Sequence, residues 1–197
     1  MTLTLQTAPA TEPLELAEAK AFLRVDVDDE NTYISALITA ARIHAENFTH
    51  RSFVTTVWDL KLDAFPCDGA PIWLPRAPLL TSTAPVVTYT DTAGASQTWS
   101  STLYTVDAPA GPHARMGRLF LNYQESYPDT RSITHAVQVR YSAGYGAAST
   151  VPEPLKVAMK LLIGHWYANR EVVVTGTTSV TVPQTVDALL WPFKSFC

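Results

Sequence analysis

The apolar residues of this chain recur with a helical period near both ends and with a strand period between them. From 29 to 50 they lie three or four positions apart, which predicts an amphipathic helix. From 53 to 63 they alternate with polar residues, and a period of two predicts a strand with one covered face. A chain that changes period in this way is predicted to combine packed helices with a sheet that has its own core.

Other segments repeat both patterns. Residues 14–25 and 155–171 have helical spacing, and several short segments are typical of strands. The expected strands are 53–63, 72–74, 85–90, 96–99, 103–107, 118–121 and 135–142. The predicted fold class is therefore α+β, with three main helices in a small bundle. An antiparallel β sandwich or barrel is inserted between the second and third helices, and an extended C-terminal arm follows.

This reading divides the chain into three regions. Residues 1–52 and 151–171 are expected to form the helical region, and 53–150 the inserted β region. Residues 172–197 are expected to form the C-terminal arm, because the composition changes to β-branched residues and then to a short apolar tail.

The last predicted helix, "LKVAMKLLIGHWYANRE", is apolar around most of its circumference. A helix of this kind is buried on two sides, and with only three helices its second side is expected to need another subunit. Gly164 costs about 1 kcal/mol relative to alanine inside a helix, which favours the close approach of another backbone there.

Composition narrows the possible functions. The formal net charge is −4, from 14 Lys and Arg against 18 Asp and Glu, which disfavours a broad basic face that grips nucleic acid. Cys67 and Cys197 lie far apart without metal-binding spacing, so two free thiols are expected. The N-terminus has no signal-peptide pattern, and no apolar run reaches the ~18 residues of a membrane span. A soluble protein made in the cytosol is expected.

No catalytic or metal-binding motif is present. His44 and His50 are six residues apart, which does not place them on one helix face, and the acidic run "DVDDEN" lacks the glycine of a calcium loop. We interpret that run as the cap of the following helix. No cofactor, metal or enzymatic activity is predicted. A hydrolase that uses His165 with Glu171 or Arg170 is the least favoured alternative.

A glycan-binding β sandwich of a virion is a further alternative, because aromatic residues can stack on sugars, although more often they fill a core or an interface. The candidate aromatics are Trp73, Tyr89, Trp99, Tyr104, Tyr123 and Tyr127.

Three ordered motifs carry a family resemblance. The first segment reads "LAEAKAFLRVD", "ISALITAAR" and "ENFTHR" (residues 16–51), the second "VPEPLKVAMKLLIGHWYANRE" (151–171), and the third "VDALLWPFK" (186–194). In this order they resemble the head–tail connector (adaptor) proteins of tailed bacteriophages and gene transfer agents, in a longer form with an inserted β domain. Any one motif alone is weak.

The resemblance implies a structural virion protein with no catalytic role. About twelve copies would form a ring under the portal protein, extend the DNA channel and offer a platform to a tail-side stopper or terminator protein. DNA would pass through without specific binding, and no membrane would be involved. The protein would be located at the head–tail interface of the virion, and in the host cytoplasm during assembly.

Two groups of residues are predicted to make contacts in such an assembly. The subunit interface is expected to use Arg42, Glu46, Trp166, Arg170 and Glu171. The portal-binding arm is expected to use Leu189, Leu190, Trp191, Phe193 and Phe196. The arm is too apolar to remain in water, so it should dock on a partner or fold back.

Overall fold

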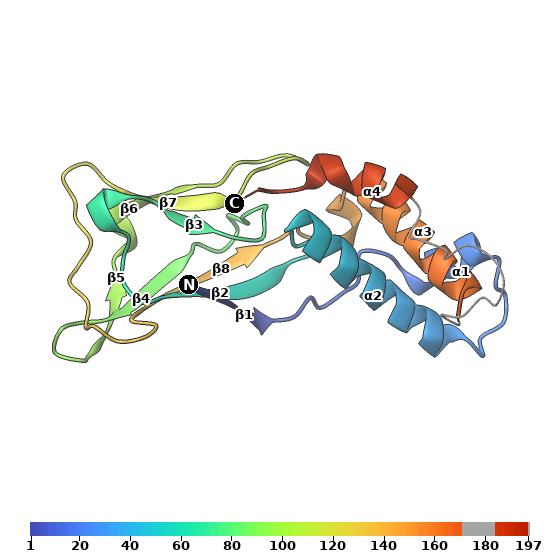
Figure 1. The fold of residues 1–197 in the computed structure, drawn as a ribbon, viewed down its shortest axis with the longest axis horizontal. Coiled ribbons are helices and arrows are strands. Elements are labelled where there is room, and N and C mark those ends of the chain that lie inside the picture. Colours follow the sequence, from blue (N-terminus) through green and yellow to red (C-terminus); the bar gives the residue numbers. More distant parts are fainter. Residues whose placement is uncertain (171–183, 197) are drawn as a thin grey trace.

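The computed structural model describes residues 1–170 and 184–196, and its helices and strands gather at opposite ends of an elongated molecule (Figure 1). The helices are α1 (Leu16–Leu23), α2 (Asn31–Thr49), α3 (Glu153–Ala168) and α4 (Gln184–Leu190). We call α1–α4 the helical part. The first three helices lie where the spacing of apolar residues predicted them.

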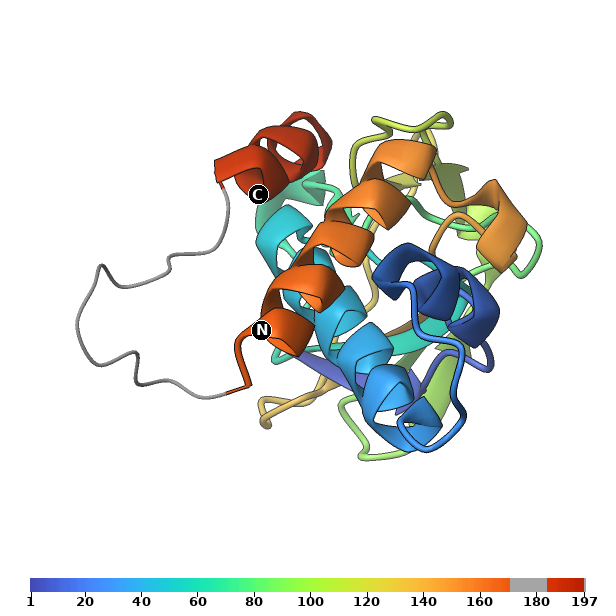
Figure 2. The same cartoon turned by 90° about the vertical axis from the view of Figure 1, so that its right-hand side faces the viewer.

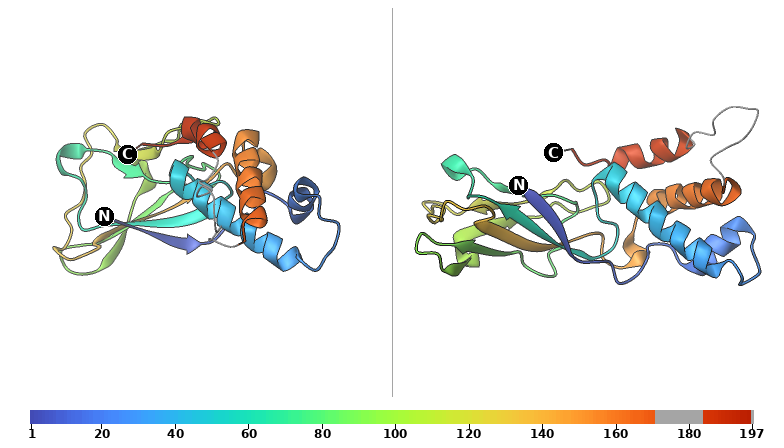
Figure 3. Two further views of the ribbon diagram at one scale, coloured as in Figure 1. Left: turned by 45° about the vertical axis from the view of Figure 1, so that its right-hand side comes forward. Right: turned by 60° about the horizontal axis from the view of Figure 1, so that its bottom comes forward.

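Helix α4 corrects the expectation of an extended C-terminal arm. It is followed by a 3₁₀ turn, Trp191–Phe193, and packs against α3 and α2 (Figure 3). The reason is burial, because Val186 and Leu190 are fully buried and Phe193 is 5% exposed. The arm folds back onto its own chain, and residues 171–183, which were predicted to belong to it, lie outside the described residues.

Eight strands form two antiparallel sheets within the described residues. They are β1 (Thr2–Thr7), β2 (Thr56–Leu62), β3 (Ile72–Leu74), β4 (Val86–Thr90), β5 (Ser96–Trp99), β6 (Tyr104–Asp107), β7 (Gly117–Leu121) and β8 (Val137–Ala143). One sheet has the order β1-β2-β8-β4-β5 and the other β3-β7-β6. We call β1–β8 the β part. Both sheets contribute to one core, which makes the β part a sandwich.

Strand β1 is the element that the sequence pattern missed. It pairs antiparallel with β2, from Thr2 opposite Lys61 to Thr7 opposite Val57, with a bulge after Leu5. The N-terminal residues therefore lie in the sheet, although no strand was predicted before the first helix. From β1 the chain crosses to the helical part and enters α1.

The helical and β parts have separate hydrophobic clusters. Ile34, Met159 and Leu162 are fully buried in the helical cluster, and Leu60, Val87 and Leu119 in the β cluster. This arrangement follows from the periods of the sequence, because each element buries the face that its own repeat makes apolar.

Helix α3 lies centrally in the helical part, in contact with α1, α2 and α4 (Figure 2). The fourth helix thus covers the side that was expected to need another subunit. Gly164 also has an explanation within the chain, since an added Cβ would lie 3.1 Å from the Phe22 ring of α1. A side chain approaches this glycine, whereas the sequence had suggested another backbone.

Asp59 on β2 and Arg140 on β8 join two neighbouring inner strands of the larger sheet. They are direct cross-strand partners, and the guanidinium donates to both carboxylate oxygens at 2.8 Å. Arg140 lowers the pKa of Asp59 below its usual 3.8, and the Asp59 side chain is 6% exposed. Because the pKa of Asp59 is lower in the folded protein than in the unfolded chain, the ion pair stabilises the fold above about pH 3.8. This stabilisation is lost as the pH falls further.

We therefore expect Asp59→Asn to lower the free energy of unfolding by about 1.5–3 kcal/mol at pH 7, as for hydrogen bonds to charged groups. The difference from wild type should shrink below pH 3.8. Urea unfolding at pH 7 and pH 3 measures both values, with Asp107→Asn, in the more exposed pair with Arg118, as the milder control. An equal loss at both pH values would contradict the assignment.

Candidate functional site

Arg42 and Glu46, predicted at a subunit interface, are engaged inside the chain. The Arg42 guanidinium lies 2.7 Å from Glu12 Oε2 and 2.9 Å from Glu46 Oε2. The other Glu46 oxygen accepts the backbone N–H of Phe53 at 2.7 Å. Burial raises the pKa of Glu46, while the Phe53 N–H and Arg42 oppose that shift. These contacts fix the turn by which the chain leaves α2 for the β part.

A groove lies between α2 and β1, and we call it the α2–β1 groove. Its volume is about 390 Å³, and its lining includes Leu5, Pro9, Ile43, Trp58 and Arg76, together with edges of Arg42 and Glu46. Leu5 is 52% exposed and Ile43 47% exposed, one from each part of the molecule. No sequence pattern indicated this groove, because its walls come from four separate segments of the chain.

Arg76 and Trp58 are held in fixed positions in this groove. Arg76 Nη1 donates to the carbonyl oxygen of Glu46 at 3.0 Å, and Nη2 donates to Asn47 Oδ1 at 2.9 Å. Its guanidinium carbon lies 5.2 Å from the Trp58 ring centroid. The Trp58 indole N–H donates to Ser52 Oγ at 3.0 Å. Tryptophan and arginine are among the residue types enriched at the energetic centres of protein interfaces.

At the other end of α2, Arg170 follows α3 and contacts the acidic run. It lies 2.5 Å from Glu30 Oε1 and stacks over the rings of Tyr33 and Tyr167. The Tyr167 hydroxyl donates to Glu30, and this bond, followed by that of Arg170, lowers the pKa of Glu30. Glu171, predicted to act with Arg170, lies outside the described residues.

The acidic run does not cap α2 as predicted. Glu30 occupies the N-cap position without a side-chain capping bond, and Asp28 accepts from Lys20 at 2.7 Å. Glu30 is bound instead by the residues at the end of α3. Trp166, also predicted at the interface, is half-buried and meets His44 edge to face at 6.0 Å.

The C-terminal segment is fastened where the two parts meet. The buried Arg51 donates from Nε to the carbonyl oxygen of Phe193, and the backbone N–H of Ser195 donates to Thr49 at 2.8 Å. The ring of His113, from the β part, lies 4.6 Å from that of Phe193.

The residues of the predicted portal-binding arm fall into a buried group and an exposed group. Leu190 and Phe193 are buried, and Leu189 is half-buried. Trp191 and Phe196 are 58% and 68% exposed, and Lys194 lies over both rings. In this conformation the two exposed aromatic rings offer the surface that a partner can reach.

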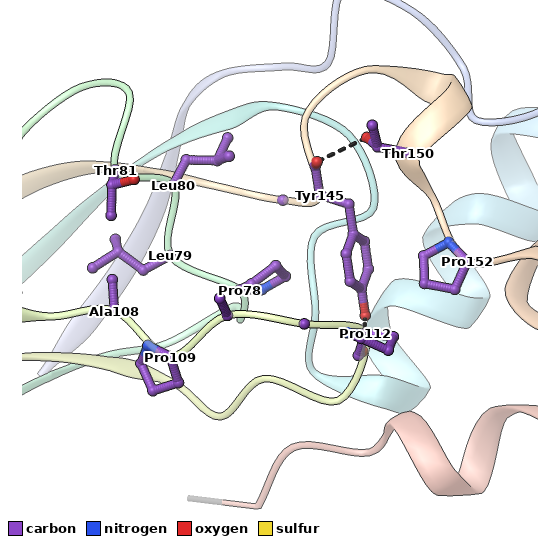
Figure 4. A pocket seen from close by; sticks show the side chains of 13 residues that line it. Pro78, Leu79, Leu80, Thr81, Ala108, Pro109, Pro112, Tyr145, Thr150 and Pro152 are labelled. Carbon is purple, nitrogen blue, oxygen red and sulfur yellow. Dashed lines mark hydrogen bonds between the residues drawn. The ribbon is translucent and has the colours of Figure 1, made fainter.

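A second pocket, of about 400 Å³, lies where the two parts adjoin and is rich in proline (Figure 4). The Tyr145 hydroxyl donates to the carbonyl oxygen of Pro112 at 2.7 Å, and Thr150 donates to that of Tyr145 at 2.8 Å. Burial raises the pKa of Tyr145. No acid, histidine, lysine, arginine or cysteine is among the described lining residues, so the pocket supplies no acid–base pair.

The aromatic residues proposed for sugar binding are divided between core and surface. Trp99 is 4% exposed and Tyr104 5% exposed, and their rings stack at 4.7 Å inside the β sandwich. Tyr127 stacks on Phe65 in the same cluster, at 4.8 Å, and Tyr89 is half-buried beside it. Trp73 and Tyr123 remain on the surface, 45% and 90% exposed.

Residues 1–170 and 184–196 contain neither a metal-binding cluster nor a membrane-spanning helix. No cluster of three or more His, Cys, Asp or Glu side chains in this range could bind a metal ion. Over the same range, no helix combines the length and apolarity needed to cross a membrane. Cys67 is a free, exposed thiol, and Cys197 is not described.

The geometry defines an α+β protein in which a helical part adjoins a β sandwich. Residues 13–84 match the family described as "Phage gp6-like head-tail connector protein", which confirms the resemblance over that range. No curated protein sequence matches the chain.

Solved structures with the same fold come from gene transfer agent (GTA) particles. A chain of the virion of a native GTA particle is 22% identical, with a TM-score of 0.80, and the match covers 100% of this chain and 97% of that one. A chain from the neck of an empty GTA particle, computed with C6 symmetry, gives the same values. A chain from the neck of a native particle, computed with C12 symmetry, is 21% identical with a TM-score of 0.67 over the same shares. These likenesses show that the chain has the fold of those proteins.

Proposed function

We propose that this protein is a structural component of a virion neck, a ring-forming head–tail adaptor between the portal and the tail. The proposal rests on two similarities that agree, one in sequence to a protein family and one in fold to solved structures. The connector family matches residues 13–84, and chains from GTA virions and necks share the fold over the whole chain. The described surface supports the proposal, because Trp191 and Phe196 are exposed aromatic side chains that a partner could cover.

A ring accounts for the symmetry of the similar necks, which were computed with sixfold and twelvefold symmetry. About twelve copies would enclose the DNA channel, and the net charge of −4 suits a channel that does not bind DNA tightly. The helical part would form the ring, and the β part would face a tail-side stopper or terminator protein. Assembly would take place in the host cytoplasm.

The exposed aromatic rings near the C-terminus are the proposed contact with the portal. Trp191 and Phe196 are accessible as the chain stands. Leu190 and Phe193 are buried, so they could add to this contact only if α4 detached from α3. We place the subunit interface near the two ends of α2, where Arg42 and Glu46 adjoin the α2–β1 groove and Arg170 holds Glu30.

Light scattering coupled to size exclusion tests the proposal, with the protein alone and with its portal. We expect a ring in at least one of the two conditions, and loss of portal binding in a Trp191→Ala, Phe196→Ala double variant that stays folded. Val86→Ala, at an apolar position of the β part that is 47% exposed, is the control. A chain that stays monomeric in both conditions and does not bind the portal would contradict the proposal.

A further inference from the structure

The solvent-facing side of α2 carries no charged residue. Its exposed positions within the helix are Thr32, Ser35, Ala36, Ala40, Ile43 and Asn47. The outer face of a surface helix is normally polar and often charged, which keeps it hydrated. This face leads along α2 into the α2–β1 groove, where Ile43 and Leu5 form an apolar rim.

Two side chains of the α2–β1 groove, Trp58 and Arg76, are held in place before any partner binds. Their indole and guanidinium groups are held by hydrogen bonds to Ser52, Glu46 and Asn47, so little freedom would be lost on binding. Arg76 has no salt bridge among the described residues, although its charge is near that of Glu46. An apolar side chain with an adjacent carboxylate would cover the Trp58 ring and pair with this guanidinium.

An exposed apolar side chain with adjacent carboxylates lies in the same chain just before α2. Val27 is 59% exposed and lies between Asp26 and the pair Asp28–Asp29. Asp28 is paired with Lys20, while Asp26 and Asp29 are exposed and have no salt bridge among the described residues. An exposed valine flanked by carboxylates without a salt bridge complements the apolar rim of the groove and the guanidinium of Arg76.

We propose that the loop between α1 and α2 of one copy docks into the α2–β1 groove of the next copy. Val27 would contact Ile43 and Trp58, and the carboxylate of Asp26 or Asp29 would pair with Arg76. The contact is heterologous, because two different surfaces meet, and such contacts close into rings when repeated by rotation. The inference rests on the proposed ring and specifies which surfaces build it.

The spacing of the two surfaces sets the size of the ring that the proposed contact would build. Val27 precedes α2 and Ile43 lies well along it. At about 1.5 Å per residue they are on the order of 20 Å apart along the helix axis. Contacts repeated at this spacing around the twelvefold symmetry of one similar neck would lie on a circle with a radius on the order of 40 Å. A circle of that size leaves room for a central channel lined by protein.

Cysteine cross-linking tests the contact directly. In a background with Cys67→Ser and Cys197→Ser, we expect the double variant Val27→Cys, Ile43→Cys to give a ladder of cross-linked species up to the full ring with a short thiol cross-linker. A mixture of the two single variants should stop at dimers, because each copy then carries only one of the two cysteines. Each single variant alone should give no cross-link between these positions.

Charge reversal gives a second, independent readout. Arg76→Glu should raise the concentration needed for half-assembly at least tenfold, and Asp29→Arg in the same chain should restore part of the loss. Arg118→Glu is the control, because Arg118 also lies over an indole ring, that of Trp73, but is not among the residues that line the groove. Thermal unfolding of each variant identifies any that fail to fold.

The outcomes distinguish this inference from the proposed function. If wild-type rings form but the double-cysteine variant gives no ladder, and Arg76→Glu assembles like Arg118→Glu, the docking of the loop is wrong while the ring stands. If no ring forms with or without the portal, the proposed function fails and the inference fails with it. A ladder together with charge rescue supports both.

Discussion

Removal of residues 184–197 is expected to unfold the helical part while the β part stays folded. The deletion takes Val186, Leu190 and Phe193 out of the helical cluster, where each is buried. Burial of such a side chain is worth about 1.5–3 kcal/mol, so the total approaches the whole stability of a typical domain, about 5–15 kcal/mol. It also leaves the buried Arg51 without the Phe193 carbonyl oxygen that its Nε binds.

Hydrogen exchange followed by mass spectrometry measures this result by region. Amides of α2 and α3 should lose protection in the truncated chain, while those of β2 and β8 should keep it. The control is Trp191→Ala with Phe196→Ala, which alters the same segment at exposed positions and should change protection little. If β2 and β8 lose protection as well, the two clusters form one cooperative unit and the proposed division at residues 53 and 150 is wrong.

The elements found from the sequence are those whose own repeat reveals them. Helix α2 has nineteen residues and a regular apolar stripe, and the strands from β2 to β8 fall where the pattern placed them. Helix α4 has seven residues, too few for a stripe to stand out, and β1 exists because β2 offers it an edge. Both depend on tertiary contacts that one sequence does not display.

The candidate site was less predictable than the fold. Arg42 was predicted at a subunit interface, but Glu12, thirty residues earlier, approaches it and completes its ion pairs. Arg76 had no signal at all, since its place over Trp58 depends on a left-handed backbone, with φ of 64°, in a non-glycine residue. The sequence shows which polar side chains are present. It does not show which hydrogen-bond and ion-pair partners they have, because those partners come from segments that only the fold brings together.

Trp99→Ala is expected to lower the free energy of unfolding of the β part by about 3–5 kcal/mol, the range for large aromatic residues removed from a core. The Trp99 ring lies within 4.7–5.5 Å of the ring centroids of Tyr104, Tyr127 and Phe65. Its indole N–H is buried without a hydrogen-bond acceptor among the described residues, so the side chain contributes through packing. Trp99→Phe should therefore retain more of the stability than Trp99→Ala.

Denaturant unfolding of these two variants and of Trp73→Ala separates a packing role from a binding role. Trp73 is on the surface, beneath the guanidinium of Arg118, and its removal should cost about 1 kcal/mol or less. If Trp99→Ala were as stable as wild type, the aromatic cluster would not be the core of the sandwich. The alternative of a glycan-binding face would then regain Trp99 as a candidate. We expect Trp73→Ala to be the most stable of the three variants, Trp99→Phe the next and Trp99→Ala the least stable. This order would show that the buried aromatic rings stabilise the β sandwich by packing.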